Sequence, residues 1–223
     1  MVGQRWPGRH GLSGLYALTP DTGDTAALVE KVAAALSGGA SAVQYRNKSA
    51  PERLRYQQAA MLRRLCEEHQ ALFIVNDDLD LAAAVRADGV HLGGDDASLA
   101  EARSCLGDAA VIGASCYDSL ARAAAAIASG ADYIAFGSFY PSSVKPDAVR
   151  ADVSLLSAAR ARWQVPLVAI GGITAANAAP LVAAGADAVA VISALFDALD
   201  TRAAAQTFTD LFVDGRHRVR ERL

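Results

Sequence analysis

The sequence predicts an α/β protein built as a single-domain (β/α)8 barrel, or TIM barrel. Eight short β-rich segments alternate with longer alanine-rich segments whose apolar residues recur at helical spacing. The stretches SGGASAVQ, RADGVHL, SGADYIAF and AGADAVAV each resemble a helix end, a Gly or Asp turn and then a strand. Eight such units in just over two hundred residues leave about 25 residues for each, near the compact end for this fold.

The predicted strands and boundaries follow from this alternation. The strands are placed at residues 15–19, 42–46, 72–76, 89–93, 111–115, 133–138, 166–171 and 188–192. The rival fold is a doubly wound open sheet, which often carries a Gly-rich turn after its first strand, and LYALTPDTGDT matches that turn poorly. We assign residues 14–213 to the barrel, residues 1–13 to an N-terminal extension expected to be flexible, and residues 214–223 to a basic C-terminal end.

The composition is that of a globular protein with small-molecule partners. The chain is 52% hydrophobic and 20% charged, and its net charge of -3 does not favour nucleic acid or an anionic membrane. It has no apolar run of about 20 residues, and MVGQRWPGRH lacks the apolar core of a secretory signal, so we expect a cytoplasmic protein. The sequence leaves a homo-oligomer open. Cys66, Cys105 and Cys116 are interpreted as reduced residues rather than a disulfide framework or a zinc site.

Basic and amide side chains follow the second predicted strand. Two-residue alternation sends Gln44, Arg46 and Lys48 to one side, while Val43 and Tyr45 face the helices. In a barrel of this type the site forms where the strands end, so these groups converge at its mouth. Arg offers a planar fork and Lys a compact charge, a combination suited to phosphate or pyrophosphate oxygens. A solvated salt-bridge cluster is the alternative.

Acidic residues follow the third and fourth predicted strands. Asn76, Asp77 and Asp78 end one strand, and Asp95 and Asp96 lie just beyond the other. Mg²⁺ takes one or two carboxylates together with phosphate oxygens and waters, so we assign the metal role to Asp77 and Asp96. Asp78 and Asp95 are interpreted as helix N-caps.

The loop after the sixth strand offers a second group of polar side chains. Ser142, Ser143 and Lys145 can bind an anion there, and Pro141 and Pro146 restrict the loop's conformations.

A phosphate cradle is predicted after the last two strands. Barrels frequently bind phosphate there, where glycine lets backbone amides approach the oxygens, so we assign Gly171, Gly172, Ile192 and Ser193 to it. His91 lies inside the fourth strand, where a core and a catalytic role are equally open. The chain thus has two predicted anion sites, one of them with a metal.

These motifs together resemble the thiamine-phosphate synthase family. The resemblance extends from LYALTP through QYRNK, VNDD, DGVHLGGDD, GAS, FGSFYPSSVKPD and AIGGIT to AVAVISAL. It implies a transferase that joins 4-amino-5-hydroxymethyl-2-methylpyrimidine pyrophosphate to a thiazole phosphate by a dissociative, Mg²⁺-assisted substitution. The chain departs from the family pattern at Asn47, Asp78, Gly94 and Val144.

The resemblance also implies roles for individual residues. Gln44, Arg46, Lys48 and Asn76 would contact the pyrimidine pyrophosphate, Asp77 and Asp96 would hold Mg²⁺, Ser115 and Lys145 would lie near the pyrophosphate, and Gly172, Ile192 and Ser193 would bind the thiazole phosphate. Arg46, Lys48, Ser115 and Lys145 would be the catalytic residues.

Two other functions compete with this one. A related thiazole tautomerase would share the barrel and the phosphate cradle, but it would not need the aspartates or the pyrophosphate cluster. A non-catalytic protein that binds a thiamine precursor would be expected to lose the leaving-group cations.

Overall fold

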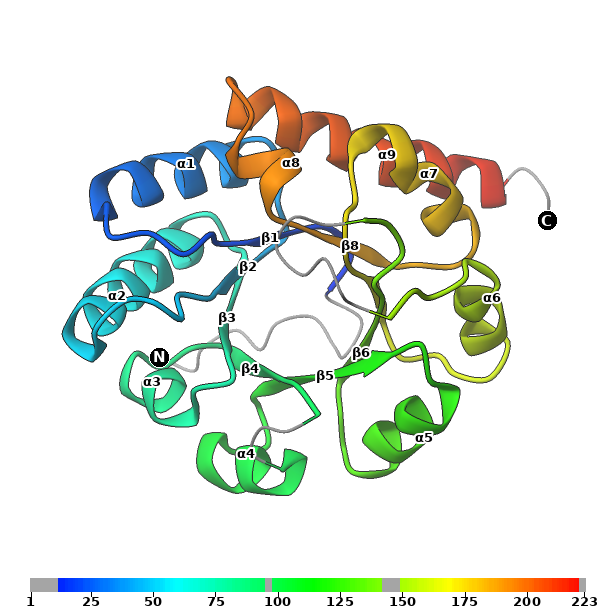
Figure 1. The fold of residues 1–223 in the computed structure, drawn as a ribbon, viewed down its shortest axis with the longest axis horizontal. Helices are drawn as coiled ribbons and strands as arrows, with labels where there is room; N and C mark the ends of the chain where they lie inside the picture. The colour runs from blue at the N-terminus through cyan, green and yellow to red at the C-terminus, as the bar shows by residue number, and fades with distance from the viewer. Residues whose placement is uncertain (1–11, 95–97, 142–148, 221–223) are drawn as a thin grey trace.

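The computed structural model describes residues 12–94, 98–141 and 149–220, with side chains described as far as residue 212. Eight parallel strands form a closed barrel in chain order, so the predicted (β/α)8 fold is confirmed (Figure 1). The strands are β1 (Gly14–Leu18), β2 (Ala42–Tyr45), β3 (Leu72–Asn76), β4 (Gly89–Leu92), β5 (Val111–Tyr117), β6 (Tyr133–Phe136), β7 (Leu167–Ala169) and β8 (Ala188–Val191). Each end lies within two residues of its predicted position.

Helices surround the barrel as an outer ring (Figure 1). They are α1 (Thr25–Ser37), α2 (Glu52–Glu68), α3 (Leu79–Ala84), α4 (Leu99–Leu106), α5 (Leu120–Ala128), α6 (Ser154–Arg160), α7 (Ala175–Ala183), α8 (Ser193–Phe196) and α9 (Thr201–Arg220). Helix α9 packs against both α1 and α7 and so closes the ring. It also continues through residues 214–220, which the sequence analysis assigned to a separate basic end. In the described part of the chain, no helix has both the length and the apolar character needed to cross a membrane.

Both faces of the barrel wall are packed. Gln44 faces the interior, whereas the hydroxyl of Tyr45 donates to Gln58 on α2 at 2.9 Å, so the predicted alternation along this strand is confirmed. Leu12, assigned to the N-terminal extension, is 3% exposed and packs with Tyr16 in the inner cluster. Residues 1–11 lie outside the described residues.

An aspartate precedes β4, β6 and β8, at the end of the barrel opposite the site. Each carboxylate accepts a backbone N–H of the preceding strand and pairs with an arginine of a neighbouring helix. The pairs are Arg63–Asp88 at 3.3 Å, Arg103–Asp132 at 2.6 Å, and Arg160–Asp187. The Asp turns that recur in the sequence therefore tie helix, strand and turn together at the face of the barrel that serves stability.

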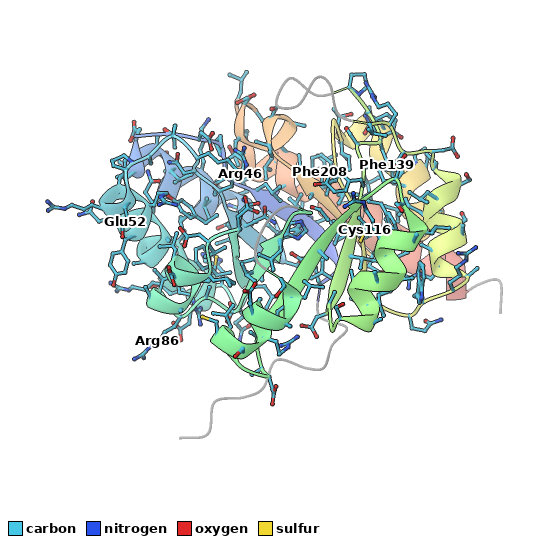
Figure 2. All side chains as sticks on the ribbon, turned by 60° about the horizontal axis from the view of Figure 1, so that its bottom comes forward. Arg46, Glu52, Arg86, Cys116, Phe139 and Phe208 are labelled. Carbon is cyan, nitrogen blue, oxygen red and sulfur yellow. The ribbon has the colours of Figure 1, made fainter. Side chains whose placement is uncertain are left out.

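The polar residues that the sequence placed at strand ends lie at the other face. Figure 2 shows Arg46 toward one end of the molecule and Arg86, at the end of α3, toward the opposite end. The fold thus separates the stabilising ion pairs from the functional groups.

Candidate active site

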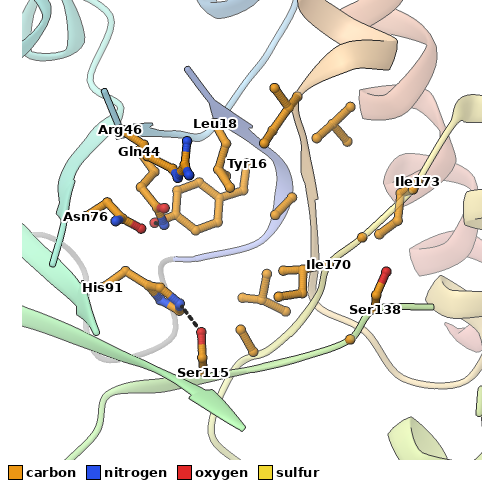
Figure 3. A pocket seen from close by; sticks show the side chains of 18 of the residues that line it. Tyr16, Leu18, Gln44, Arg46, Asn76, His91, Ser115, Ser138, Ile170 and Ile173 are labelled. Carbon is orange, nitrogen blue, oxygen red and sulfur yellow. Dashed lines mark hydrogen bonds between the residues drawn. The ribbon is translucent and has the colours of Figure 1, made fainter. Parts of the chain in front are cut away.

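A cavity of about 570 Å³ opens at the C-terminal ends of the strands. Figure 3 shows Gln44, Arg46 and Asn76 on one side of it and Ile170, Ile173 and Ser138 on the other. The predicted site residues that line it are Gln44, Arg46, Lys48, Asn76, Asp77, Ser115, Gly171, Gly172, Ile192 and Ser193. Asp96, Ser142, Ser143 and Lys145 lie outside the described residues. The structure therefore brings ten predicted residues from five strand ends together in one cavity.

The cationic side of the cavity is organised by an aspartate that sequence reasoning missed. One carboxylate oxygen of Asp21, in the loop after β1, accepts from the guanidinium of Arg46 at 2.9 Å and from the backbone N–H of Lys48 at 3.1 Å. The hydroxyl of Thr19 also bonds the backbone of Arg46. These contacts fix the loop after β2, so its cations stay at the mouth. The motif LTPDTGD contains Asp21. Its role in holding Arg46 becomes visible only when β1 pairs with β2 and brings the two loops together.

The acidic side follows β3. Asp77 adopts a positive φ of 63°, a conformation that Asp tolerates better than most residues. A carboxylate oxygen of Asp77 lies 3.1 Å from the ammonium nitrogen of Lys48, so the two charged loops meet across the mouth.

The cap assignments were right for one helix and wrong for another. The carboxylate of Asp78 accepts from the backbone N–H of Leu81 at 2.9 Å and so caps α3, as predicted. Ser98, rather than Asp95, is the N-cap of α4, where its hydroxyl accepts from the backbone N–H of Glu101 in a capping box. The sequence SLAE contained that signal, because Ser followed three residues later by Glu is typical of a helix start. Asp95 itself lies outside the described residues.

The opposite side of the cavity is formed by backbone. Gly171 and Gly172 follow β7 with φ values of 92° and 64°. A Cβ on Gly172 would lie 2.2 Å from the carbonyl oxygen of Pro141, so this turn has no room for a side chain. Helix α8 begins at Ser193, directly after Ile192 at the end of β8. A phosphate site built from the loops after strands seven and eight and a short extra helix is common in barrels, and this chain has all three parts.

Polar side chains line the bottom of the cavity. The ring of His91 points into the barrel, with Nδ1 2.9 Å from the Tyr133 hydroxyl and Nε2 2.9 Å from the Ser115 hydroxyl. Burial raises the pKa values of Tyr16 and Tyr133 above the ordinary tyrosine value, so both hydroxyls stay neutral. Sequence reasoning left His91 unassigned and overlooked both tyrosines.

This arrangement can hold anions at two places. Arg46 and Lys48 offer charge on one side, and the turn at Gly171 and Gly172 offers backbone on the other. Among the residues that the structure describes, no group of three or more His, Cys, Asp or Glu side chains could hold a metal ion. Mg²⁺ needs only one or two protein carboxylates when phosphate oxygens complete its shell, so the Asp77 carboxylate fits that ion. Fold and site together define the class of (β/α)8-barrel enzymes whose cavity is suited to phosphorylated ligands.

Comparison with known proteins identifies the family. Residues 15–195 match the family model described as thiamine monophosphate synthase, so the chain belongs to that family. The thiamine-phosphate synthase of Thiobacillus denitrificans is 59% identical over 199 residues, which cover 89% of this chain and 94% of that protein. The Methylobacillus flagellatus protein of the same name is 54% identical over 207 residues, covering 92% and 99%.

A solved structure gives the same result. The thiamine phosphate pyrophosphorylase of Pyrococcus furiosus superposes with a TM-score of 0.83 at 39% identity, covering 93% of this chain and 98% of that one. The predicted family and its transferase class are therefore confirmed.

Proposed function

We propose that this chain joins 4-amino-5-hydroxymethyl-2-methylpyrimidine pyrophosphate to a thiazole phosphate, forming thiamine phosphate and releasing pyrophosphate. The observation that carries the proposal is one cavity whose two sides offer different groups to an anion. One side presents Arg46 and Lys48, and the other presents the Gly171–Gly172 turn and the start of α8. A reaction between a pyrophosphate and a phosphate needs both sides, with the reacting ends held between them.

The pyrimidine pyrophosphate would bind on the cationic side. Its bond to pyrophosphate breaks, both electrons leave with the pyrophosphate, and a stabilised pyrimidine methylene cation remains. Arg46 and Lys48 face the oxygens that gain negative charge in this step, so they stabilise the transition state more than the bound substrate. Asp21 holds the Arg46 guanidinium at 2.9 Å and thereby limits its reorganisation as charge develops.

The thiazole phosphate would bind on the backbone side, at Gly171, Gly172, Ile192 and Ser193. Its ring nitrogen then attacks the pyrimidine cation with its lone pair, and the new carbon–nitrogen bond completes thiamine phosphate. No protein nucleophile is required. The protein's task is to hold the two reactants in line and to exclude water from the cation.

We also propose that Mg²⁺ takes part. Asp77, together with Asp96, would hold the ion, which when bound would neutralise part of the pyrophosphate charge. The Lys48 ammonium lies 3.1 Å from the Asp77 carboxylate, which supports this assignment, because a pyrophosphate bound there would be within reach of both the cation and the metal-binding carboxylate.

The competing functions use only part of this site. A thiazole tautomerase would need the backbone cradle but neither Asp77 nor the cations after β2. A non-catalytic binding protein would not need groups that stabilise a leaving pyrophosphate. We further propose a cytoplasmic enzyme with small-molecule substrates and no nucleic-acid or membrane partner, because both substrates are phosphorylated metabolites.

The test is a coupled assay of pyrophosphate release with both substrates and Mg²⁺. Thiamine phosphate and pyrophosphate should form in equal amounts, and omission of either substrate should stop both. Proton exchange on the thiazole without pyrophosphate release would identify a tautomerase, and binding without turnover would identify a non-catalytic protein. Arg46→Ala should lose activity, whereas Arg64→Ala, which alters an exposed arginine on α2, should retain it.

A further inference from the structure

A continuous chain of hydrogen bonds crosses the barrel beneath the cavity. The amide nitrogen of Gln44 donates to the Tyr16 hydroxyl at 2.8 Å, and that hydroxyl lies 3.0 Å from the Tyr133 hydroxyl. The Tyr133 hydroxyl lies 2.9 Å from His91 Nδ1, and His91 Nε2 lies 2.9 Å from Ser115 Oγ. Figure 3 shows the His91–Ser115 end of this chain. Its two terminal members, from β2 and β5, both line the cavity.

The middle of the chain is built into the core. Tyr16 and Tyr133 are each 1% exposed, so their hydroxyls must find partners within the protein. The Tyr133 ring stacks on His91, with centroids 5.5 Å apart, and meets the edge of Tyr16 at 6.1 Å. Gly113 on β5 makes room for it, because a Cβ there would lie 2.0 Å from the Tyr133 ring. Packing therefore holds both hydroxyls in place.

Proton counting gives the chain a direction. The Tyr16 hydroxyl is buried, so its single proton needs an acceptor within the protein. Of its two hydrogen-bond partners, the Gln44 amide nitrogen is itself a donor, so Tyr16 donates to Tyr133. The Tyr133 hydroxyl then donates to His91 Nδ1. With Nδ1 as acceptor, the proton of the neutral imidazole lies on Nε2 and is donated to Ser115 Oγ. The Ser115 hydroxyl keeps its own proton, which is free to point into the cavity.

We infer that Tyr16 and Tyr133 are positioning residues that set the hydrogen-bonding polarity of the pyrimidine substrate's binding site. They hold the Gln44 amide with one N–H directed into the protein, which leaves its carbonyl oxygen as an acceptor for substrate. Through His91 they make Ser115 a donor toward substrate at the far end of the chain. This inference rests on the proposed function for the identity of the substrate, whereas the direction of the chain rests on the hydrogen bonds alone.

Loss of the Tyr133 hydroxyl should reverse the direction of the hydrogen bond between His91 and Ser115. In Tyr133→Phe, His91 Nδ1 loses its donor, so the tautomer with the proton on Nδ1 is no longer disfavoured. In that tautomer Nε2 accepts from Ser115, and the Ser115 proton turns away from the cavity. We expect kcat/KM for the pyrimidine pyrophosphate to fall roughly 3- to 10-fold, the effect of one lost hydrogen bond. The KM for the thiazole phosphate should change less than about twofold, because the chain of hydrogen bonds does not reach the Gly171–Gly172 turn.

Two measurements test the inference. In resting wild-type protein labelled with ¹⁵N-histidine, above about pH 7.5, the His91 ring should show a protonated Nε2 and an unprotonated Nδ1. His91→Gln assigns the signal among the four histidines. A wild-type Nδ1–H tautomer would overturn the inference even if no variant folded. In kinetics, the factor lost on Tyr133→Phe should be smaller in a Ser115→Ala background than in wild type, since the hydroxyl through which Tyr133 acts is then absent.

Tyr45→Phe is the matched control, because it removes another buried tyrosine hydroxyl, one that donates to Gln58 outside the barrel. It should leave both KM values and the His91 tautomer unchanged. Equal KM increases for both substrates in Tyr133→Phe would refute the positioning role. So would a Tyr133→Phe substitution that lowers kcat/KM by the same factor in wild type and in the Ser115→Ala background. A wild-type protein that forms no thiamine phosphate would refute the proposed function instead. The NMR result would still decide the direction of the hydrogen bonds.

Discussion

The Lys48 ammonium nitrogen lies 3.1 Å from a carboxylate oxygen of Asp77, so a cation from the loop after β2 meets an anion from the end of β3. Both side chains line the cavity, and the Lys48 side chain is 58% exposed. An exposed pair of this kind contributes little to stability. The proposed function explains its placement better, because Lys48 would contact the pyrophosphate oxygens and Asp77 would contact the Mg²⁺ bound to them.

Asp77→Asn tests the metal assignment. Asn tolerates the positive φ at this position, so the backbone should be retained while one metal-binding charge is lost. We expect the rate of thiamine phosphate formation to fall at least about 100-fold, the lower range for removing one preorganised charge-stabilising group. The half-saturating Mg²⁺ concentration should rise, and adding Asp96→Ala should abolish activity.

Asp80→Asn provides the control, because Asp80 is exposed in the first turn of α3 and does not line the cavity. It should leave the Mg²⁺ titration unchanged. A wild-type rate and Mg²⁺ dependence in Asp77→Asn would remove Asp77 from the metal site.

Gly172→Ala should act on the thiazole phosphate side. The added Cβ would meet the carbonyl oxygens of Pro141 at 2.2 Å and Tyr140 at 2.6 Å, so the turn and the loop after β6 must move apart. We therefore expect the KM for the thiazole phosphate to rise more than the KM for the pyrimidine pyrophosphate. Backbone strain at positive φ should also lower the free energy of unfolding by about 1 to 3 kcal/mol, measurable by urea denaturation.

Gly23→Ala is the matched substitution, since a Cβ at Gly23 has no atom within 4 Å and its φ is not positive. Both KM values should stay at the wild-type level there. Equal KM increases for the two substrates in Gly172→Ala would indicate general damage to the barrel rather than a specific cradle.

The sequence predicted the strands well because each element has a local signal. Two-residue alternation placed Gln44 inside and Tyr45 outside, and the Asp turns marked where β4, β6 and β8 begin. Helix α8 was missed because four residues, SALF, are too few to show a helical period. Strand β5 runs beyond its predicted end, where its pairing with β6 shifts register between Ser115 and Tyr117, a local irregularity that no alternation pattern reports.

The parts of the site that were missed depend on contacts between distant residues. Tyr16 and Tyr133 are 117 positions apart, and each looks like an ordinary core aromatic in its own strand. Asp21 likewise looks like a turn residue until the barrel brings it to Arg46, 25 positions later. Predicting such partners requires the register of neighbouring strands, which depends on the whole barrel.

The three cysteines should differ sharply in reactivity. Burial raises the pKa values of the Cys66 and Cys116 thiols to about 12, so almost no thiolate forms at neutral pH, whereas Cys105 is exposed. Iodoacetamide at about pH 8 should therefore add one adduct per folded chain and three per unfolded chain, counted by mass spectrometry. Cys105→Ser should show no adduct when folded. Rapid labelling of a second cysteine in the folded protein would show that Cys66 or Cys116 is not buried.

Lys145→Ala tests whether a cation from the loop after β6 acts on the departing pyrophosphate. Lys145 lies outside the described residues, but the segment that precedes its loop lines the cavity. Ser138 and Pro141 line it, and the backbone of Ser138 bonds Val149 at 3.1 Å and Ala151 at 2.9 Å, which brings the two ends of the loop together.

A cation that contacts oxygens gaining charge as the bond breaks stabilises the transition state more than the bound substrate. We expect Lys145→Ala to cost about 2 to 4 kcal/mol of transition-state stabilisation, and single-turnover formation of thiamine phosphate should slow roughly 30- to 1,000-fold. Substrate affinity should change far less. Arg202→Ala, at an exposed position on α9, should have no effect. A Lys145→Ala rate within about twofold of wild type would show instead that Lys145 is an ordinary surface lysine, whose charge contributes almost nothing to the reaction.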